Sequence, residues 1–139
     1  MIPCVLDTDT LTLYRHGHTL VCQRVASQKP DDLAITVMSV EEQLSGWYSL
    51  LRQAKQRKQL ARVYQELAES VQFLGGWRIL SFPEPAIVRY AQLAALKLQV
   101  RKMDLRIAAI TLENAGTLVT RNLRDFQRVP GLAVEDWAQ

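Results

Sequence analysis

The chain has 139 residues, of which 48% are hydrophobic and 22% charged, and 17 Lys and Arg against 14 Asp and Glu give a net charge of +3. A chain of this length folds around one core, and its average composition excludes a disordered tail or a fibrous repeat. We therefore expect one domain over residues 1–139.

The cysteine pattern and the apolar runs indicate the cellular compartment that we expect. The cysteines Cys4 and Cys22 form no CxxC pair, which argues against a structural zinc site or a disulfide framework. No apolar run approaches the roughly 18 residues that span a bilayer, and Asp7 stands where a signal peptide carries basic residues. We expect a soluble, cytoplasmic protein without a membrane partner.

Two short apolar runs in the first third of the chain predict buried strands. Residues 2–6 form the first run and residues 33–38 the second, and both are too short for stable helices. After the first run, Asp7 can cap a helix near residues 11–15. After the second, Ser39 is expected to cap another helix.

Helical periodicity dominates the middle of the chain. Apolar residues at steps of three and four between residues 60 and 74 predict a helix that forms a hairpin with the preceding one, joined near Arg57. Gly75 and Gly76 end it, and residues 78–82 read as a third strand.

Two further helices and two strands are predicted in the last third. Pro83-Glu84-Pro85 opens one helix, and Asp104 begins the next, which stops at Gly116. Residues 117–120 and 132–134 read as the fourth and fifth strands. Strands that alternate with helices predict an α/β fold, a three-layer α/β/α sandwich with a central parallel sheet.

Acidic residues follow the predicted strands. Asp7, Glu41, Glu42 and the segment 121–125 all come after strands, and sites in parallel sheets form beyond the carboxyl ends of the strands. Acids gathered there repel one another unless a cation lies between them, and Mg²⁺ or Mn²⁺ takes oxygen ligands and can activate water. Each acid alone also has a structural explanation, as a helix cap or as a first-turn residue such as Asp104.

The positive charge is concentrated in the second half of the chain. Residues 51–128 contain 14 basic and six acidic side chains. Solvated helix faces would explain such an excess, but basic residues around a chemical site would attract anionic partners.

The order of several short motifs resembles that of PIN domains. The motifs are Val5-Leu6-Asp7-Thr8-Asp9, Ser39-Val40-Glu41-Glu42, Met103-Asp104 and Thr120-Arg121-Asn122-Leu123-Arg124-Asp125-Phe126. The whole chain resembles the VapC-type toxin ribonucleases of bacterial type II toxin–antitoxin systems. Its ending, residues 126–137, is similar to that of the subgroup that cleaves initiator tRNA.

The resemblance implies roles for individual residues. Asp7, Glu42 and Asp104 match the family's three acids, which hold Mg²⁺ or Mn²⁺ for phosphodiester hydrolysis. Glu42 is matched rather than Glu41 because Gly46 follows it by four residues, as the family pattern requires.

Two positions depart from the family pattern and leave the metal count open. Asn122 is the fourth catalytic position, where many members have Asp, and Asp9 stands where the family usually has Asn. Thr120 and Asp125 would support the site. Phosphate binding is expected from the flanking basic residues Arg101, Lys102, Arg106, Arg121 and Arg124. The implied partners are an RNA substrate such as tRNA, a VapB-like antitoxin, and a second copy of the chain in a homodimer.

Two alternatives remain open at this point. Asp7-Thr8-Asp9 after an apolar strand also resembles the nucleophile motif of haloacid-dehalogenase phosphatases, although Leu11 stands where that motif expects Thr or Val. A PIN-like module that binds RNA or protein without catalysis is the other, and Asn122 favours it.

Overall fold

Five parallel strands form the centre of the computed structural model, which describes residues 2–139. They are arranged in the order β3-β2-β1-β4-β5, and every pair of neighbours is parallel. The carboxyl ends of all strands therefore lie at the same edge of the sheet. The strands are β1 (Cys4–Leu6), β2 (Leu33–Thr36), β3 (Ile79–Leu80), β4 (Thr117–Val119) and β5 (Ala133–Glu135).

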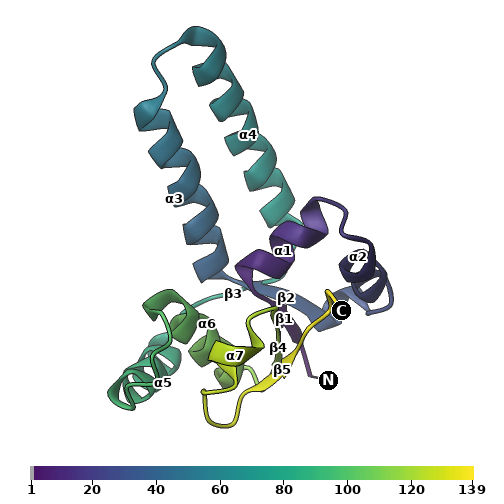
Figure 1. Cartoon of the computed structure of the whole chain (residues 1–139), viewed down its shortest axis with the longest axis vertical. Helices are drawn as coiled ribbons and strands as arrows, with labels where there is room; N and C mark the ends of the chain where they lie inside the picture. Colours follow the sequence, from purple (N-terminus) through teal and green to yellow (C-terminus); the bar gives the residue numbers. More distant parts are fainter. Residues whose placement is uncertain (1) are drawn as a thin grey trace.

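Helices connect the strands and cover the sheet (Figure 1). A long antiparallel hairpin of α3 and α4 projects away from the sheet, while α5 and α6 pack against each other on the other side of the molecule. The helices are α1 (Thr8–Arg15), α2 (Thr19–Ala26), α3 (Val37–Gln53), α4 (Arg57–Gly75), α5 (Glu84–Ala95), α6 (Lys102–Glu113) and α7 (Leu123–Phe126), with a 3₁₀ turn at Pro30–Asp32. Within residues 2–139, no helix combines the length and apolarity that a bilayer crossing needs.

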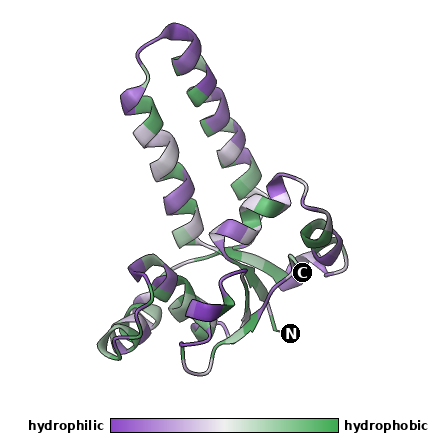
Figure 2. Ribbon diagram, in the orientation of Figure 1, coloured by the Kyte–Doolittle hydropathy of each residue, from purple (hydrophilic) through white to green (hydrophobic). Residues whose placement is uncertain are grey.

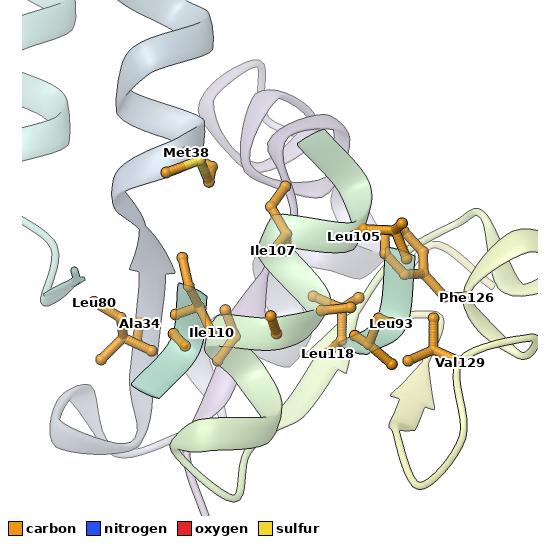
Figure 3. Close-up of a cluster of buried hydrophobic side chains, with 14 residues drawn as sticks. Ala34, Met38, Leu80, Leu93, Leu105, Ile107, Ile110, Leu118, Phe126 and Val129 are labelled. Carbon is orange, nitrogen blue, oxygen red and sulfur yellow. The ribbon is translucent and has the colours of Figure 1, made fainter. Parts of the chain in front are cut away.

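The core has two halves, one on each face of the sheet. Consecutive strand residues point to opposite faces, so Val5 and Leu118 join the cluster beneath α5 and α6, shown in Figure 3, whereas Leu6 and Val119 join the cluster beneath α1 and α2. Both faces are therefore buried, which confirms the predicted layered α/β fold with its central parallel sheet.

The buried hydroxyl of Ser70 connects the hairpin of α3 and α4 to α1. The side chain of Ser70 is fully buried and accepts hydrogen bonds from Trp47 Nε1 and Arg15 Nη1, each at 2.8 Å. The Arg15 guanidinium also lies over the ring of Phe73. In Figure 2, hydrophilic and hydrophobic residues are mixed along the whole hairpin, as expected for helices with one packed and one solvated face.

Several predicted boundaries were wrong by a few residues. The second strand ends at Thr36 rather than at residue 38, and Thr36 rather than Ser39 caps α3, because the Thr36 hydroxyl accepts a hydrogen bond from the Ser39 backbone N–H. The third strand has two residues instead of the predicted five. The helix predicted to begin at Asp104 begins two residues earlier, at Lys102.

Two helices were not predicted at all. The short helix α2 follows a turn at Gly17, whose φ of +82° favours glycine, and His18 caps the helix by accepting from the Val21 backbone N–H. The four-residue helix α7 is capped by Asn122. Both are too short for hydrophobic periodicity to reveal.

Candidate metal centre and active site

Four carboxylates line one cavity at the carboxyl edge of the sheet. The cavity has a volume of about 130 Å³. Its walls come from the start of α1, from the first part of α3 and from the start of α6, so three separate elements contribute to it. The lining residues are Asp7, Thr8, Asp9, Glu42, Arg101 and Asp104.

Asp7 is fixed between β1 and α1. Its backbone N–H donates to the carbonyl of Val119 in β4 at 3.0 Å, and its Oδ1 accepts from the Thr10 backbone N–H at 2.9 Å, which caps α1. Burial raises the pKa of Asp7 above its ordinary value, and hydrogen bonds from Thr120 and Thr10 oppose that rise. Asp7 is thus a helix cap, as expected. It is also a buried acid whose negative form a nearby positive charge would stabilise.

Glu42 reaches the cavity from α3 and is oriented by α1. Thr8 donates its hydroxyl proton to Glu42 Oε1 at 2.8 Å, and the Thr8 and Ser39 hydroxyl oxygens are 2.9 Å apart. The sequence did not reveal these roles of Thr8 and Ser39, although Ser39 precedes Glu42 by one helical turn and therefore shares its face. Glu41 is exposed, and Glu42 rather than Glu41 lines the cavity, in agreement with the match made on the sequence.

Asp104 lies in the first turn of α6 and is held by the residue that precedes the helix. Arg101 donates from Nε to Asp104 Oδ2 at 3.1 Å and from Nη2 to Asp104 Oδ1 at 3.4 Å. Both oxygens of the carboxylate are therefore engaged by one guanidinium. Asp9, the fourth acid of the cavity, is exposed.

The predicted fourth polar position lies beside the cavity, outside its lining residues. Asn122 donates from its backbone N–H to Thr120 Oγ1 and from Nδ2 to Asp125 Oδ2, both at 2.9 Å. Asp125 also pairs with Arg128 at 3.4 Å. Since Thr120 in turn hydrogen-bonds to Asp7, the group reaches the cavity through Thr120.

The predicted phosphate-binding residues are placed differently from one another. Arg101 lines the cavity, and Lys102, Arg121 and Arg124 are exposed. Arg106 instead turns to α5, where its guanidinium lies over the rings of Phe82 and Tyr90, and its buried Nε has no hydrogen-bond partner within the described residues. Its role in phosphate binding stays a prediction without a contact at the cavity.

The donor set fits a hard divalent cation, although its ligands are not yet gathered. Four carboxylates on one small polar cavity, one of them buried with a raised pKa, supply the oxygen ligands that Mg²⁺ and Mn²⁺ prefer. Among residues 2–139, however, no three acids, histidines or cysteines already stand close enough together to hold a metal ion. Arg101 engages both oxygens of Asp104 and Thr8 engages one oxygen of Glu42, so a cation would compete with Arg101 at Asp104.

A larger groove lies along the hairpin and shares no lining residue with the cavity. It has a volume of about 670 Å³ and lies between α1 and the facing sides of α3 and α4. Gln43, next to Glu42, is among its lining residues. The others include Arg15, Trp47, Leu50, Arg62 and Val63.

Comparisons with known proteins found similar sequences and similar folds. No protein-family model matches the chain. Ribonuclease VapC1 from two strains of Haemophilus influenzae is 28% identical over 142 residues, covering 97% of this chain and 98% of the relative. The DNA-bound VapBC complex from Salmonella typhimurium has a chain with a TM-score of 0.77 and 24% identity, covering 99% of both chains. VapBC-1 from nontypeable Haemophilus influenzae gives a TM-score of 0.75 and 22% identity over the full length of both chains.

The chain has the fold of the matched chains in these VapBC complexes. Its five-stranded parallel sheet and flanking helices match those chains from end to end. The three acids that the resemblance singled out, Asp7, Glu42 and Asp104, line one cavity, because Asp7 follows β1 and the other two lie in the first part of α3 and in the first turn of α6. The initiator-tRNA subgroup suggested by the sequence ending stays a prediction.

Proposed function

We propose that this chain is a Mg²⁺- or Mn²⁺-dependent endoribonuclease, a toxin of a VapC-type toxin–antitoxin pair. The observation that carries the proposal is the cavity on which Asp7, Glu42 and Asp104 meet from three elements. The VapC1 relatives are ribonucleases, and the agreement over nearly the whole chain supports extending this activity to the present protein.

Each residue of the cavity has a proposed role in metal binding or hydrolysis. A bound Mg²⁺ or Mn²⁺ would supply a Lewis acid and an activated water for phosphodiester hydrolysis. Asp7 and Asp104 would hold the cation, and Glu42, oriented by Thr8, would hold it or accept a proton from the attacking water. The exposed cations Lys102, Arg121 and Arg124 would hold phosphates without reading bases.

Cleavage by an Asp104→Asn variant tests this function. The side chains are nearly the same size, so we expect the variant to fold but to lose metal-dependent cleavage of a tRNA pool. Undiminished cleavage would contradict the assignment. If neither the wild-type protein nor the variant binds Mn²⁺ or cleaves RNA, the module without catalysis becomes the better explanation.

The substrate we propose is tRNA, and initiator tRNA in particular. The support is the similarity of residues 126–137 to the ending of that subgroup. Sequencing of the RNA ends that accumulate after induction, beside an Asp7→Ala control, would identify the target. Breaks spread over many messenger RNAs and absent from tRNA would overturn the proposal.

We further propose a VapB-like antitoxin as the inhibitor, docked in the groove between α1 and the hairpin. The solved relatives are complexes of VapB with VapC. The groove combines an apolar wall, from Leu50 and Val63, with the charged side chains of Arg15 and Arg62. An inhibitor seated there would contact Gln43, the residue that follows Glu42 in α3.

A homodimer is proposed on the family resemblance. Ile87 and Val88 of α5 are 45% and 53% exposed, which leaves an apolar face available. Sedimentation of the purified chain at several concentrations would show a dimer, and a monomer at every concentration would overturn the proposal.

A further inference from the structure

Arg101 occupies the wall of the acid cavity in a position that a metal ion would need. It is the residue immediately before α6, and its backbone carbonyl accepts from the Leu105 N–H, so the start of the helix fixes its main chain. From there its guanidinium engages both carboxylate oxygens of Asp104. A cation that binds Asp104 therefore competes with Arg101 for the same two oxygens.

The two side chains of the Arg101–Asp104 ion pair differ strongly in solvent exposure. The Asp104 side chain is 10% exposed, whereas the Arg101 side chain is 75% exposed. The guanidinium thus covers a buried acid from the solvent side and can move away without opening the core. Ion pairs with an exposed partner contribute little free energy, so exchange for another cation is not prevented by the strength of the pair.

Arg101 serves the other acids of the cavity as well as Asp104. The hydrogen bond to Asp104 raises the pKa of Arg101, and the charges of Asp104, Glu42 and Asp9 add to this rise. Arg101 is the one basic residue among those that line the cavity. Without it, four acids would face one another with no positive charge between them, which is unfavourable.

We propose that Arg101 is a resident counter-cation that competes with the divalent metal ion for Asp104. With the guanidinium paired, the charge of Asp104 is compensated and both of its oxygens are engaged; with the metal bound, Arg101 turns out toward solvent. The cavity therefore holds a cation in both states. This inference rests on the proposed metal-dependent function, and it adds a second occupant to the same site.

Calorimetric titration of the full chain with Mn²⁺ tests the competition. We expect Arg101→Gln to bind Mn²⁺ about fivefold more tightly than the wild type, because the competing pair and the adjacent positive charge are both removed. Arg101→Lys should lie between them, since an ammonium keeps the charge but cannot engage both oxygens in the planar fork. Lys97→Gln removes the same charge from an exposed position outside the cavity and should change the affinity less than about twofold.

The outcomes separate the two proposals. If the wild type binds Mn²⁺ and Arg101→Gln binds it equally or more weakly, the competition is overturned while the metal site stands. If no variant binds Mn²⁺, the proposed metal centre itself fails. Binding by Arg101→Gln alone would support the competition in its strongest form.

Thermal unfolding provides a readout that needs no RNA. In EDTA, Arg101→Gln should unfold at a lower temperature than Lys97→Gln, because its acids lose their counter-cation. Added Mn²⁺ should then raise the unfolding temperature of Arg101→Gln by more than that of the wild type. Equal rises in all variants would contradict the proposal.

Discussion

The Thr8 hydroxyl donates to the Glu42 carboxylate at 2.8 Å and so ties the first turn of α1 to α3 across the cavity. Because Thr8 has only one hydroxyl proton, the short contact with Ser39 must have Ser39 as the donor. The three side chains therefore form a directed series, Ser39 to Thr8 to Glu42. Its effect is to point one carboxylate oxygen of Glu42 at α1 and to leave the other for chemistry.

A Thr8→Val substitution should weaken RNA cleavage while the protein stays folded. Valine keeps the shape of threonine but cannot donate, so Glu42 loses the bond that orients it. A hydrogen bond to a charged group contributes about 1.5–3 kcal/mol, and we expect a fall of about tenfold or more in single-turnover cleavage at saturating metal.

Two matched variants complete this experiment. Thr8→Ser restores the hydroxyl and should restore cleavage. Thr111→Val removes a hydroxyl that bonds only to the backbone carbonyl of Ile107, within α6, and should leave cleavage close to that of the wild type. Equal losses in Thr8→Val and Thr8→Ser would contradict an orienting role of the hydroxyl.

The buried carboxyl of Asp7 should make stability depend on pH. Burial raises the pKa of Asp7, so the folded protein holds this proton more tightly than the unfolded chain does. Stability is then lost as the pH rises from the ordinary Asp value of about 3.9 through the higher folded pKa. Asp7→Asn can still cap α1 and avoids this loss. Its stability advantage over the wild type should therefore grow with pH across that window and stay constant above it.

Urea unfolding in EDTA between about pH 3.5 and 7.5 measures the effect. Asp31→Asn, an exposed position in the 3₁₀ turn, controls for removal of one negative charge. A difference between Asp7→Asn and the wild type that is the same at every pH would show that the buried carboxyl is not the cause.

The sequence predicted the layered fold because its signals are local. Short apolar runs bounded by polar residues mark the strands, and the spacing of apolar residues marks α4. The prediction failed where the decisive contact is a single polar one. Thr36 caps α3 in place of Ser39, and His18 caps the undetected α2. Such caps depend on where the chain turns, which periodicity does not reveal.

The site was predictable in part for the same reason. Asp7, Glu42 and Asp104 could be grouped because motif order and strand ends are properties of the sequence. The bond from Thr8 to Glu42 spans 34 residues of sequence and depends on how α1 packs beside α3. Arg101 was expected near the acids as a phosphate-binding residue, but its pairing with Asp104 was hidden, since an exposed arginine before a helix has many available partners.

Ser70→Ala should destabilise the hairpin. Its hydroxyl accepts from both Trp47 and Arg15 at a fully buried point, and alanine would leave two donors without an acceptor. We expect a loss of about 1–3 kcal/mol in the free energy of unfolding. Urea titration measures this loss. In a double-mutant cycle, the double variant with Trp47→Phe should lose less free energy of unfolding than the two single variants lose together. Strictly additive losses would mean that the hydrogen bond between Trp47 and Ser70 does not contribute to stability.

Leu50→Lys should weaken antitoxin binding without weakening cleavage. Leu50 lines the groove beside the hairpin and is 42% exposed, so a lysine is tolerated by the fold but places a charge against an apolar partner surface. We expect a loss of about tenfold or more in affinity for the cognate antitoxin, measured with the purified complex. Val71→Lys on α4 is also exposed, at 52%, but lies outside the residues that line the groove. Equal losses for the two variants would place the antitoxin elsewhere.

Asn122→Asp should destabilise the protein, although many VapC-type proteins have Asp at the matching position. Here Asn122 Nδ2 donates to Asp125 Oδ2 at 2.9 Å, so an aspartate would set two carboxylates against each other at the start of α7. We expect a loss of about 1 kcal/mol at pH 7 in EDTA. Asp125→Asn introduced into the variant reverses the donor and the acceptor and should recover part of that loss, even though it weakens the pair with Arg128. Additive losses of stability in this cycle would contradict the argument. Recovery would mean that Asp125 favours an amide at position 122. The carboxylate that many VapC-type proteins have at position 122 would then be replaced here by the carboxylate of Asp125.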